Sequence, residues 1–195
     1  MKAAYIEAYG GSDQLKFGEL PVPKSRPDDV LVEVHAASVN PVDWKIREGH
    51  LRAMLEFPMP LVLGWDLTGT VASLVERASQ LKVGDAVFGR SAIARQGTYA
   101  QFVAVDARLL AAKPASLPFP EAASPPLVAQ TAWQVMVETT VAGRGDRIFI
   151  GAGSGGVEVW VPVVVPARLY RRASSLSPDD NRHGKPIWRR GCPGF

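Results

Sequence analysis

The chain has 195 residues, of which 47% are hydrophobic and 21% are charged, and its formal net charge is +3. This length suits one domain, or one domain with part of another, and the composition is typical of a folded globular chain rather than a disordered one. The small net charge argues against nucleic acid and against a membrane surface as partners.

The one cysteine, Cys192, leaves no disulfide within the chain and no cysteine-rich zinc site. The N-terminus has no long apolar segment before Glu7, which argues against a secretory signal. No apolar run approaches the roughly 20 residues that cross a bilayer. We therefore expect a cytoplasmic protein without a membrane partner.

Short strands separated by glycine and proline turns are predicted from the start of the chain to about residue 113. The clearest covers 29–39, where Val30, Val32 and Val34 share one face and His35 lies on the solvent face. Regular short strands of this kind predict a mostly antiparallel barrel or sandwich. The other strands are expected at 2–8, 15–20, 68–75, 85–90, 99–105 and 109–112.

One helix is predicted within this series, over residues 40–49. Asn40 is a good N-cap, and Pro41 suits the first helical position, where its missing N–H costs nothing. Asp43 stands three residues after the cap, and Gly49 can close the far end.

From residue 118 the pattern changes to helices and one short strand. A short helix is expected at 121–123 and a longer one at 127–141, the latter with a buried stripe of Ala132, Val135, Met136 and Val141. An apolar strand at 147–150 then runs into a glycine-rich turn at 151–157. A strand followed by such a turn predicts the start of a nucleotide-binding domain.

A helix should follow that turn, but Pro162, Pro166 and a valine run argue against one after Val157. We therefore expect residues 158–195 to lack regular structure and the strand at 147–150 to lack the neighbours that would bury it. A change this abrupt suggests a shifted reading frame or a misjoined exon. Translating the coding DNA in its other frames past codon 157 tests that hypothesis.

The glycine-rich turn is the first candidate site. Gly151-Ala152-Gly153-Ser154-Gly155-Gly156 matches the pattern G-x-G-x-x-G. Glycines let backbone N–H groups approach a pyrophosphate, and the next helix's N-terminus favours the anion. The alternative is a flexible linker, but the apolar strand before the turn favours a nucleotide loop.

The second candidate site combines Asn40, Asp43 and Lys45 with the downstream segment Gly64-Trp65-Asp66. These groups could form the lip of a cleft that binds a substrate carbonyl or a nicotinamide amide. Spacing alone favours plain helix capping for Asn40 and Asp43 and a solvated charge for Lys45. The three histidines, His35, His50 and His183, show no metal-ligand spacing, and no Ser-His-Asp triad with a nucleophile elbow is present.

Several segments match one family's motifs in order and spacing. They are Met1-Lys2-Ala3-Ala4, Tyr9-Gly10-Gly11, residues 30–43, residues 63–69, residues 82–89, Gly97-Thr98-Tyr99-Ala100, Thr131-Ala132-Trp133 and Gly155-Gly156-Val157. With them the chain resembles the N-terminal part of medium-chain dehydrogenase/reductases, and most of all the zinc-independent quinone oxidoreductases of the zeta-crystallin-like group. The resemblance covers about four fifths of the chain and stops at Glu158.

The resemblance implies a mostly β fold with an α/β start. A GroES-like β-barrel catalytic domain would occupy residues 1–125, and the first helix, strand and glycine-rich turn of an incomplete Rossmann domain would occupy 126–157. An aberrant, disordered tail would fill 158–195. The implied reaction is hydride transfer from NADPH to a small-molecule quinone or activated alkene, in which the cofactor supplies the chemistry.

The resemblance also implies roles for particular residues. Asn40 and Lys45 would be the catalytic residues of the cleft, with Asn40 and Thr131 beside the nicotinamide. The pyrophosphate turn would consist of Ser154, Gly155, Gly156 and Val157.

Two departures from the family pattern limit these expectations. Zinc-dependent relatives carry a cysteine near the position of Asn40 and Gly-His-Glu where this chain has Gly64-Trp65-Asp66, so no catalytic zinc is expected. The last glycine of the family's turn is Glu158 here, and the family's dimer strand lies beyond the point where the resemblance ends.

We therefore expect the chain alone to be truncated, to bind NADPH poorly and not to reduce quinones. The alternative is a non-enzymatic GroES-like module that binds a partner or a full-length homologue. A basic arm over 168–190 that binds nucleic acid is the least favoured reading, because its basic residues are scattered without aromatic residues between them.

Overall fold

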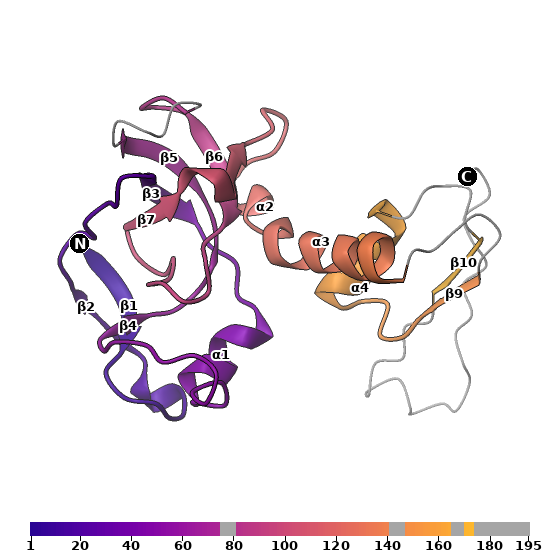
Figure 1. The fold of residues 1–195 in the computed structure, drawn as a ribbon, viewed down its shortest axis with the longest axis horizontal. Coiled ribbons are helices and arrows are strands. Elements are labelled where there is room, and N and C mark those ends of the chain that lie inside the picture. Colours follow the sequence, from indigo (N-terminus) through magenta and orange to yellow (C-terminus); the bar gives the residue numbers. More distant parts are fainter. Residues whose placement is uncertain (75–80, 141–146, 165–169, 174–195) are drawn as a thin grey trace. The chain divides into compact units, whose positions relative to one another are not determined.

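The computed structural model describes residues 1–74, 81–140, 147–164 and 170–173. The chain separates into two compact units, Met1–Pro126 and Leu127–Phe195. The first unit, drawn from indigo to magenta in Figure 1, consists mainly of strands. Its elements are β1 (Lys2–Ile6), η1 (Ser12–Gln14), β2 (Lys16–Glu19), β3 (Asp29–Ala36), α1 (Pro41–Arg47), β4 (Leu61–Val62), β5 (Asp66–Leu74), β6 (Ala86–Arg90), β7 (Phe102–Asp106), η2 (Ala107–Leu109), β8 (Leu110–Ala112) and α2 (Phe119–Ala122).

A five-stranded antiparallel sheet forms one half of this unit, in the order β7-β3-β5-β6-β8. The alternation predicted for β3 is confirmed, because Val30 and Val32 are fully buried whereas Glu33 and His35 are exposed. The two valines join a cluster with Leu67, Val71, Val87, Val103 and Val105. Each such side chain contributes about 1.5–3 kcal/mol by leaving water, so this apolar face holds the sheet in its register.

A three-stranded antiparallel sheet, in the order β2-β1-β4, forms the other half. Its core cluster consists of Ile6, Ile46, Phe57, Leu61, Leu63 and Trp65, so that α1 is fixed to the sheet through Ile46. The segment before β7 touches β1, where the Ala4 N–H donates to the Tyr99 carbonyl at 2.7 Å. This link is a single isolated bridge between Ala3 and Ala100.

The mostly β, GroES-like prediction is confirmed, but the predicted closed barrel is not observed in the described residues. β2 pairs there only with β1, and β8 pairs only with β6. A closed barrel requires an unbroken ladder of paired strands, and the single bridge at Ala3 does not supply one.

The helix predicted over 40–49 is confirmed as α1. Asn40 has the extended backbone of an N-cap, and its N–H donates to Asp43 Oδ2 at 2.6 Å. That bond is the half of a capping box in which the N3 side chain reaches back to the cap. Beyond the helix, the Gly49 N–H donates to the Ile46 carbonyl, and Gly49 takes φ +81° as a helix-ending glycine does.

The second unit holds a small α/β arrangement, shown in orange and yellow in Figure 1. Helix α3 (Pro125–Trp133) continues into the π-helical turn η3 (Gln134–Thr139), which confirms the helix predicted from residue 127. Strand β9 (Arg147–Ile150), helix α4 (Gly156–Val164) and strand β10 (Tyr170–Ala173) follow. Their core cluster consists of Ala132, Met136, Ile150 and Val161, whereas Val135 is 46% exposed and Val141 lies outside the described residues.

The prediction that no helix follows the glycine-rich turn is wrong for residues 156–164. Val157, Trp160, Val161 and Val164 recur at helical spacing and pack against the same core cluster. Pro162 lies inside α4 and leaves the Glu158 carbonyl without the usual N–H donor. Burial of an apolar face therefore outweighs the low helix propensity of the proline and the valines.

The prediction of a lone strand at 147–150 is also wrong. β10 pairs with β9 in parallel, with Tyr170 opposite Arg147 and Ala173 opposite Ile150. The two strands are joined through α4, which makes a β-α-β unit of the kind found in parallel sheets. The rest of the predicted tail, residues 165–169 and 174–195, lies outside the described residues.

None of the helices within the described ranges combines the length and the apolar character that a membrane crossing requires.

Candidate functional site

A buried polar network surrounds the start of α1. Asn40 follows β3, and its Nδ2 donates to Asp66 Oδ2 at 2.8 Å and to Ser38 Oγ at 3.1 Å. Ser38 Oγ in turn donates to Asp66 Oδ2 at 2.7 Å. Asp66 is the first residue of β5, so residues distant in sequence meet where β3 gives way to the helix. With Asp43 and Tyr99, these three residues form what we call the Asn40 network.

Asp43 connects the network to the body of the first unit. Its Oδ2 accepts hydrogen bonds from the Asn40 N–H at 2.6 Å and from the Tyr99 hydroxyl at 2.7 Å. Its Oδ1 is buried and has no hydrogen-bond partner among the described residues. Burial raises the pKa of Asp43, although the two hydrogen bonds oppose the shift.

Tyr99 remains a hydrogen-bond donor within this network. Burial raises its pKa, and the neighbouring Asp43 carboxylate raises the pKa further by accepting a hydrogen bond from the hydroxyl and by its charge. The hydroxyl therefore stays protonated at neutral pH and holds Asp43, whose carboxylate holds the N-cap. In this way Tyr99 fixes the direction in which α1 leaves the sheet.

A glycine makes room for the Tyr99 ring. Gly64 has φ +82°, a backbone conformation that L side chains rarely adopt. A Cβ placed there would lie 2.3 Å from Cε1 of Tyr99. The Gly64 position therefore requires glycine both for its backbone and for the close approach of the ring.

Lys45 lies on the exposed side of α1, apart from the Asn40 network. Its ammonium stands 5.7 Å from the centroid of the Trp44 ring, and it forms no ion pair with any described residue. The His50 ring meets the Trp44 ring edge-on, with 5.9 Å between centroids. Lys45 is therefore a solvated cation near an aromatic ring. The capping interpretation is confirmed in part, because Asn40 and Asp43 cap the helix but also belong to the buried network.

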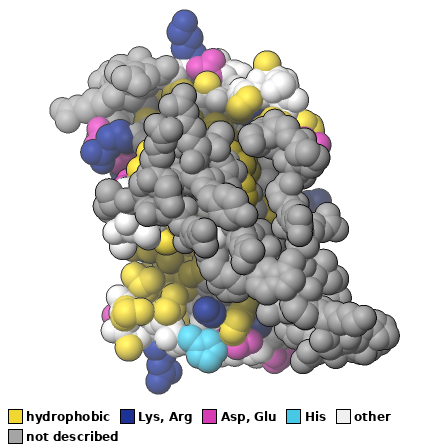
Figure 2. Space-filling view, turned by 90° about the vertical axis from the view of Figure 1, so that its right-hand side faces the viewer, with side chains coloured by type: hydrophobic (Ala, Val, Ile, Leu, Met, Phe, Trp, Pro, Cys, Tyr) yellow, Lys and Arg dark blue, Asp and Glu magenta, His cyan; other side chains and the backbone are white. Residues whose placement is uncertain are grey.

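Apolar side chains are exposed around α1. Val39 and Met54 are 80% and 75% exposed, and Trp44 is 42% exposed. Figure 2 shows hydrophobic side chains gathered beside a histidine at the lower end of the view, the level at which α1 lies in Figure 1. We call Val39, Trp44 and Met54 the α1 rim. Lys45 and Arg52 are exposed cations in the same part of the sequence, and neither forms an ion pair with a described residue.

The glycine-rich turn lies in the second unit and joins β9 to α4. It is closed by a hydrogen bond from the Gly155 N–H to the Ala152 carbonyl at 2.7 Å, and Ala152 takes φ +54°. A Cβ at Gly156 would lie 2.9 Å from Cγ1 of Val128 on α3, so glycine here permits close packing of α4 on α3. Ser154 and Gly156 are exposed, and Val157 packs inward. The strand and the helix are therefore joined by a tight turn that depends on glycine.

Glu158 lies in the first turn of α4, next to the glycine-rich turn. Its Oε2 lies 2.2 Å from where a Cβ at Gly155 would be, in the first turn of α4. A helix N-terminus attracts a negative charge, and Glu158 supplies one from within the chain. Residues 151–157 contain no lysine or arginine that could offset it. The turn thus has a negative charge beside it and no basic side chain within it.

Thr131 lies on α3 in the second unit, whereas Asn40 and Lys45 belong to the first. Its Oγ1 donates to the Leu127 carbonyl at 2.8 Å, within its own helix. Among the described residues, Asn40 is hydrogen-bonded to Asp66 and Ser38, and no hydrogen bond joins the Asn40 side chain to Lys45. The predicted roles of these residues in catalysis and cofactor binding stay predictions.

Sequence reasoning missed Ser38 and Tyr99 as members of the network. The signal in the sequence was the segment Gly97-Thr98-Tyr99 itself, which is one of the matched motifs. The structure explains its glycine, since Gly97 has no room for a side chain beside the Leu63 and Gly64 carbonyls. Among the described residues, no three His, Cys, Asp or Glu side chains gather where they could hold a metal ion.

Known proteins resemble the chain in both sequence and fold. Residues 26–115 match the family model of the alcohol dehydrogenase GroES-like domain. An NADPH-dependent alkenal/one oxidoreductase of Arabidopsis thaliana is 37% identical over 80% of this chain and 42% of its own length. A quinone-oxidoreductase homolog of Spinacia oleracea is 35% identical over 80% of this chain and 50% of its own.

A solved structure agrees with these relatives. An alcohol dehydrogenase superfamily protein from Novosphingobium aromaticivorans superposes with a TM-score of 0.82 at 38% identity, over 92% of this chain and 54% of that one. The chain spans about half the length of the curated relatives it matches. The GroES-like domain and these relatives support placing the chain in the quinone oxidoreductase-like group of the medium-chain dehydrogenase/reductase superfamily.

Proposed function

We propose that this chain supplies the substrate-side domain of a zinc-independent, NADPH-dependent reductase of quinones or activated alkenes in the cytoplasm. The observation that carries the proposal is the Asn40 network, which fixes α1 so that Lys45 and the α1 rim stand together on the surface. The names of the relatives support it, since they include an NADPH-dependent alkenal/one oxidoreductase and a quinone-oxidoreductase homolog.

The residues of α1 have separate roles in this proposal. Trp44 and the rest of the α1 rim provide a flat apolar surface for the ring or alkene of the substrate. The Lys45 ammonium donates a hydrogen bond to the substrate's carbonyl oxygen, on which negative charge develops when hydride is accepted. The Asn40 network keeps this surface in place, and Asn40 itself acts by positioning.

The absence of zinc from the mechanism is supported by Trp65. This side chain is buried in the second core cluster beside Phe57. By the family resemblance, zinc-dependent relatives carry a histidine at this position. An indole cannot ligate zinc. Metal analysis of the purified chain should therefore find less than stoichiometric zinc, and about one tightly bound zinc per chain would contradict this part of the proposal.

NADPH would supply the hydride, but Glu158 disfavours its pyrophosphate at the turn. The 195-residue chain by itself is therefore expected to bind NADPH weakly and to show no measurable quinone reduction. Calorimetric titration with NADPH and a quinone-reduction assay test this. Micromolar affinity with saturable turnover would contradict it.

Substrate binding can be tested without turnover. Duroquinone titrated into the labelled full chain should shift the amide resonances of α1, and Lys45→Met should weaken binding about threefold through loss of one hydrogen bond. Lys82→Met is the matched control, because Lys82 is an exposed cation remote in sequence from α1. Equal weakening by both variants, or no shift in α1, would remove the basis for a substrate site here.

A second candidate is a non-enzymatic GroES-like module. The observation in its favour is that the first unit has two buried clusters of its own and a complete five-stranded sheet. If duroquinone does not shift the α1 resonances, that result would favour the non-enzymatic module over the reductase.

A further inference from the structure

A cavity of about 440 Å³ lies in the first unit, away from the Asn40 network. It is bordered by the segment between β2 and β3, the segment before β4, the loop after β6 and the strand β7. None of the five residues of the Asn40 network lines it. Its volume falls within the ~300–1,000 Å³ of small-molecule pockets.

The walls of this cavity are apolar and rigid. Phe57 and Phe102 supply aromatic surface, and four prolines supply fixed backbone: Pro21, Pro23, Pro58 and Pro60. A proline ring fixes φ, so such walls lose little conformational entropy when a ligand binds. The cavity is therefore suited to a compact apolar body rather than to a polar or heavily hydrated one.

The charged side chains that line the cavity are all cationic. Lys24, Arg26 and Arg95 are among its lining residues, and no aspartate or glutamate is. Arg95 is already neutralised, since its two terminal nitrogens donate to Asp29 at 2.7 and 2.6 Å. Lys24 and Arg26 form no ion pair with any described residue.

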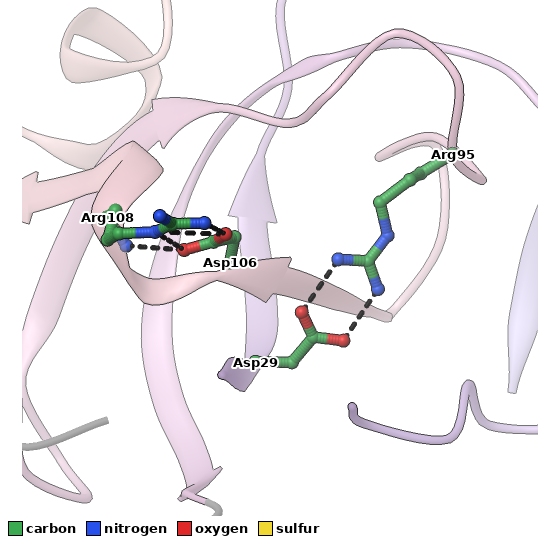
Figure 3. A network of polar contacts seen from close by, with 4 residues as sticks. All are labelled: Asp29, Arg95, Asp106 and Arg108. Carbon is green, nitrogen blue, oxygen red and sulfur yellow. Dashed lines mark hydrogen bonds and ion pairs between the residues drawn. The ribbon is translucent and has the colours of Figure 1, made fainter. Parts of the chain in front are cut away.

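Figure 3 shows two carboxylates of the first unit, each bonded to its own arginine. Arg95 reaches from the loop after β6 to the Asp29 carboxylate at the start of β3, while Arg108 folds over Asp106. Each carboxylate of this group is held by its own arginine. The charge of Arg26 also acts on Asp29, whose carboxylate is held by Arg95, so Lys24 and Arg26 bring positive charge to a cavity whose lining residues include no carboxylate.

From this combination we infer that the cavity binds a small aromatic monocarboxylate, with its ring between Phe57 and the proline walls and its carboxylate facing Lys24 and Arg26. The aromatic ring of the ligand would fill the apolar volume, and its carboxylate would pair with Lys24 and Arg26. The site is separate from the proposed reductase surface, and it would bind its ligand whether or not α1 binds a quinone.

The test uses 1-naphthoate and its neutral analogue 1-naphthamide, titrated into the labelled full chain by two-dimensional NMR. Naphthoate should shift amides that line the cavity, such as those of Gln96 and Gly97, and bind at least about tenfold more tightly than the amide. The double variant Lys24→Gln/Arg26→Gln should weaken naphthoate binding about tenfold and leave naphthamide binding unchanged.

Two controls keep the test decisive. Lys82→Gln removes an exposed cation outside the cavity and should leave naphthoate binding unchanged. Ala94→Trp fills the cavity from an exposed position and should abolish the shifts of Gln96 and Gly97 while the α1 resonances stay in place. No binding at millimolar naphthoate, equal affinity for the two ligands, or equal loss in the Lys82→Gln variant would each overturn the inference.

Discussion

The two units of the chain are stabilised to different degrees. In the described residues, the first unit has one cluster of seven buried apolar residues and another of six, whereas the second has one of four. The first unit also has the Asn40 network and the Asp29–Arg95 pair, which join distant segments. Burial rather than local propensity sets stability, so the first unit should survive conditions under which the second opens.

The largest expected effect lies in the second core cluster of the first unit. Trp65→Ala should lower the free energy of unfolding by about 3–5 kcal/mol, because the fully buried indole leaves a cavity beside Phe57. Urea denaturation followed by circular dichroism measures this. Trp44→Ala is the control, since Trp44 is half exposed and its loss should cost less than about 1 kcal/mol. Similar costs for the two variants would contradict the proposed importance of this cluster.

The next effect concerns the pair between Asp29 and Arg95. Asp29→Asn should destabilise the first unit by about 2 kcal/mol, since it leaves the Arg95 guanidinium without its charged partner. Burial opposes ionisation, but hydrogen bonds from Arg95 and from the Arg26 N–H lower the pKa of Asp29 overall. The stability that this carboxylate contributes is therefore complete above its unfolded pKa of about 3.9 and is lost as the pH falls below it.

The pH dependence separates Asp29 from Asp43. Burial raises the pKa of Asp43, so this carboxyl contributes in the opposite sense and favours the folded state as the pH falls towards its unfolded pKa. Urea midpoints measured between pH 3 and pH 7 should flatten in Asp29→Asn and steepen in Asp43→Asn. Identical pH profiles for the two variants would show that neither carboxyl has the environment described.

A smaller effect is expected in the second unit. Pro162→Ala should stabilise α4 by about 1–2 kcal/mol, because alanine restores the N–H that bonds to the Glu158 carbonyl. Hydrogen exchange of the α4 amides should slow. Pro41→Ala is the matched control, since Pro41 stands at the first position of α1, where a proline costs nothing. Unchanged exchange in Pro162→Ala would mean that packing alone sets the stability of α4.

The smallest effect concerns NADPH. Glu158→Gln removes the charge at the start of α4 and should strengthen NADPH binding to the chain about threefold. Glu121→Gln, an exposed acid in the first turn of α2, should leave the affinity unchanged. A gain in both variants would point to net charge rather than to the turn.

The first unit was largely predictable because its signals are local. The alternation around Val30 and Val32 predicts a strand, and Asn40, Pro41 and Asp43 predict a helix start, since each acts through its own neighbours. The strand ends were less predictable. The segment 99–101 is predicted as strand, yet Tyr99 bonds to β1 and Gln101 bonds to both β1 and β3, and β7 begins only at Phe102.

The second unit and the site were less predictable because they depend on distant contacts. α4 exists through burial of Val157 and Val161 against α3 and β9, which no local propensity registers. The Asn40 amide turns to Asp66, 26 residues away, and Tyr99 reaches Asp43 across 56 residues. Neither pairing has a signature in spacing. The exposure of Lys45, by contrast, follows from its helical spacing, which favours a solvated charge.

The contact between Gly64 and Tyr99 has a consequence for how this sequence can vary. Gly64 and Gly84 both have positive φ, at +82° and +94°, but a Cβ at Gly64 would collide with Tyr99 whereas one at Gly84 would meet nothing within 4 Å. In a saturation library selected for folded protein, position 64 should accept no other amino acid. Position 84 should accept asparagine and aspartate, the residues that best tolerate a left-handed backbone. Two glycines whose φ angles are both positive would thus differ in the substitutions that they tolerate.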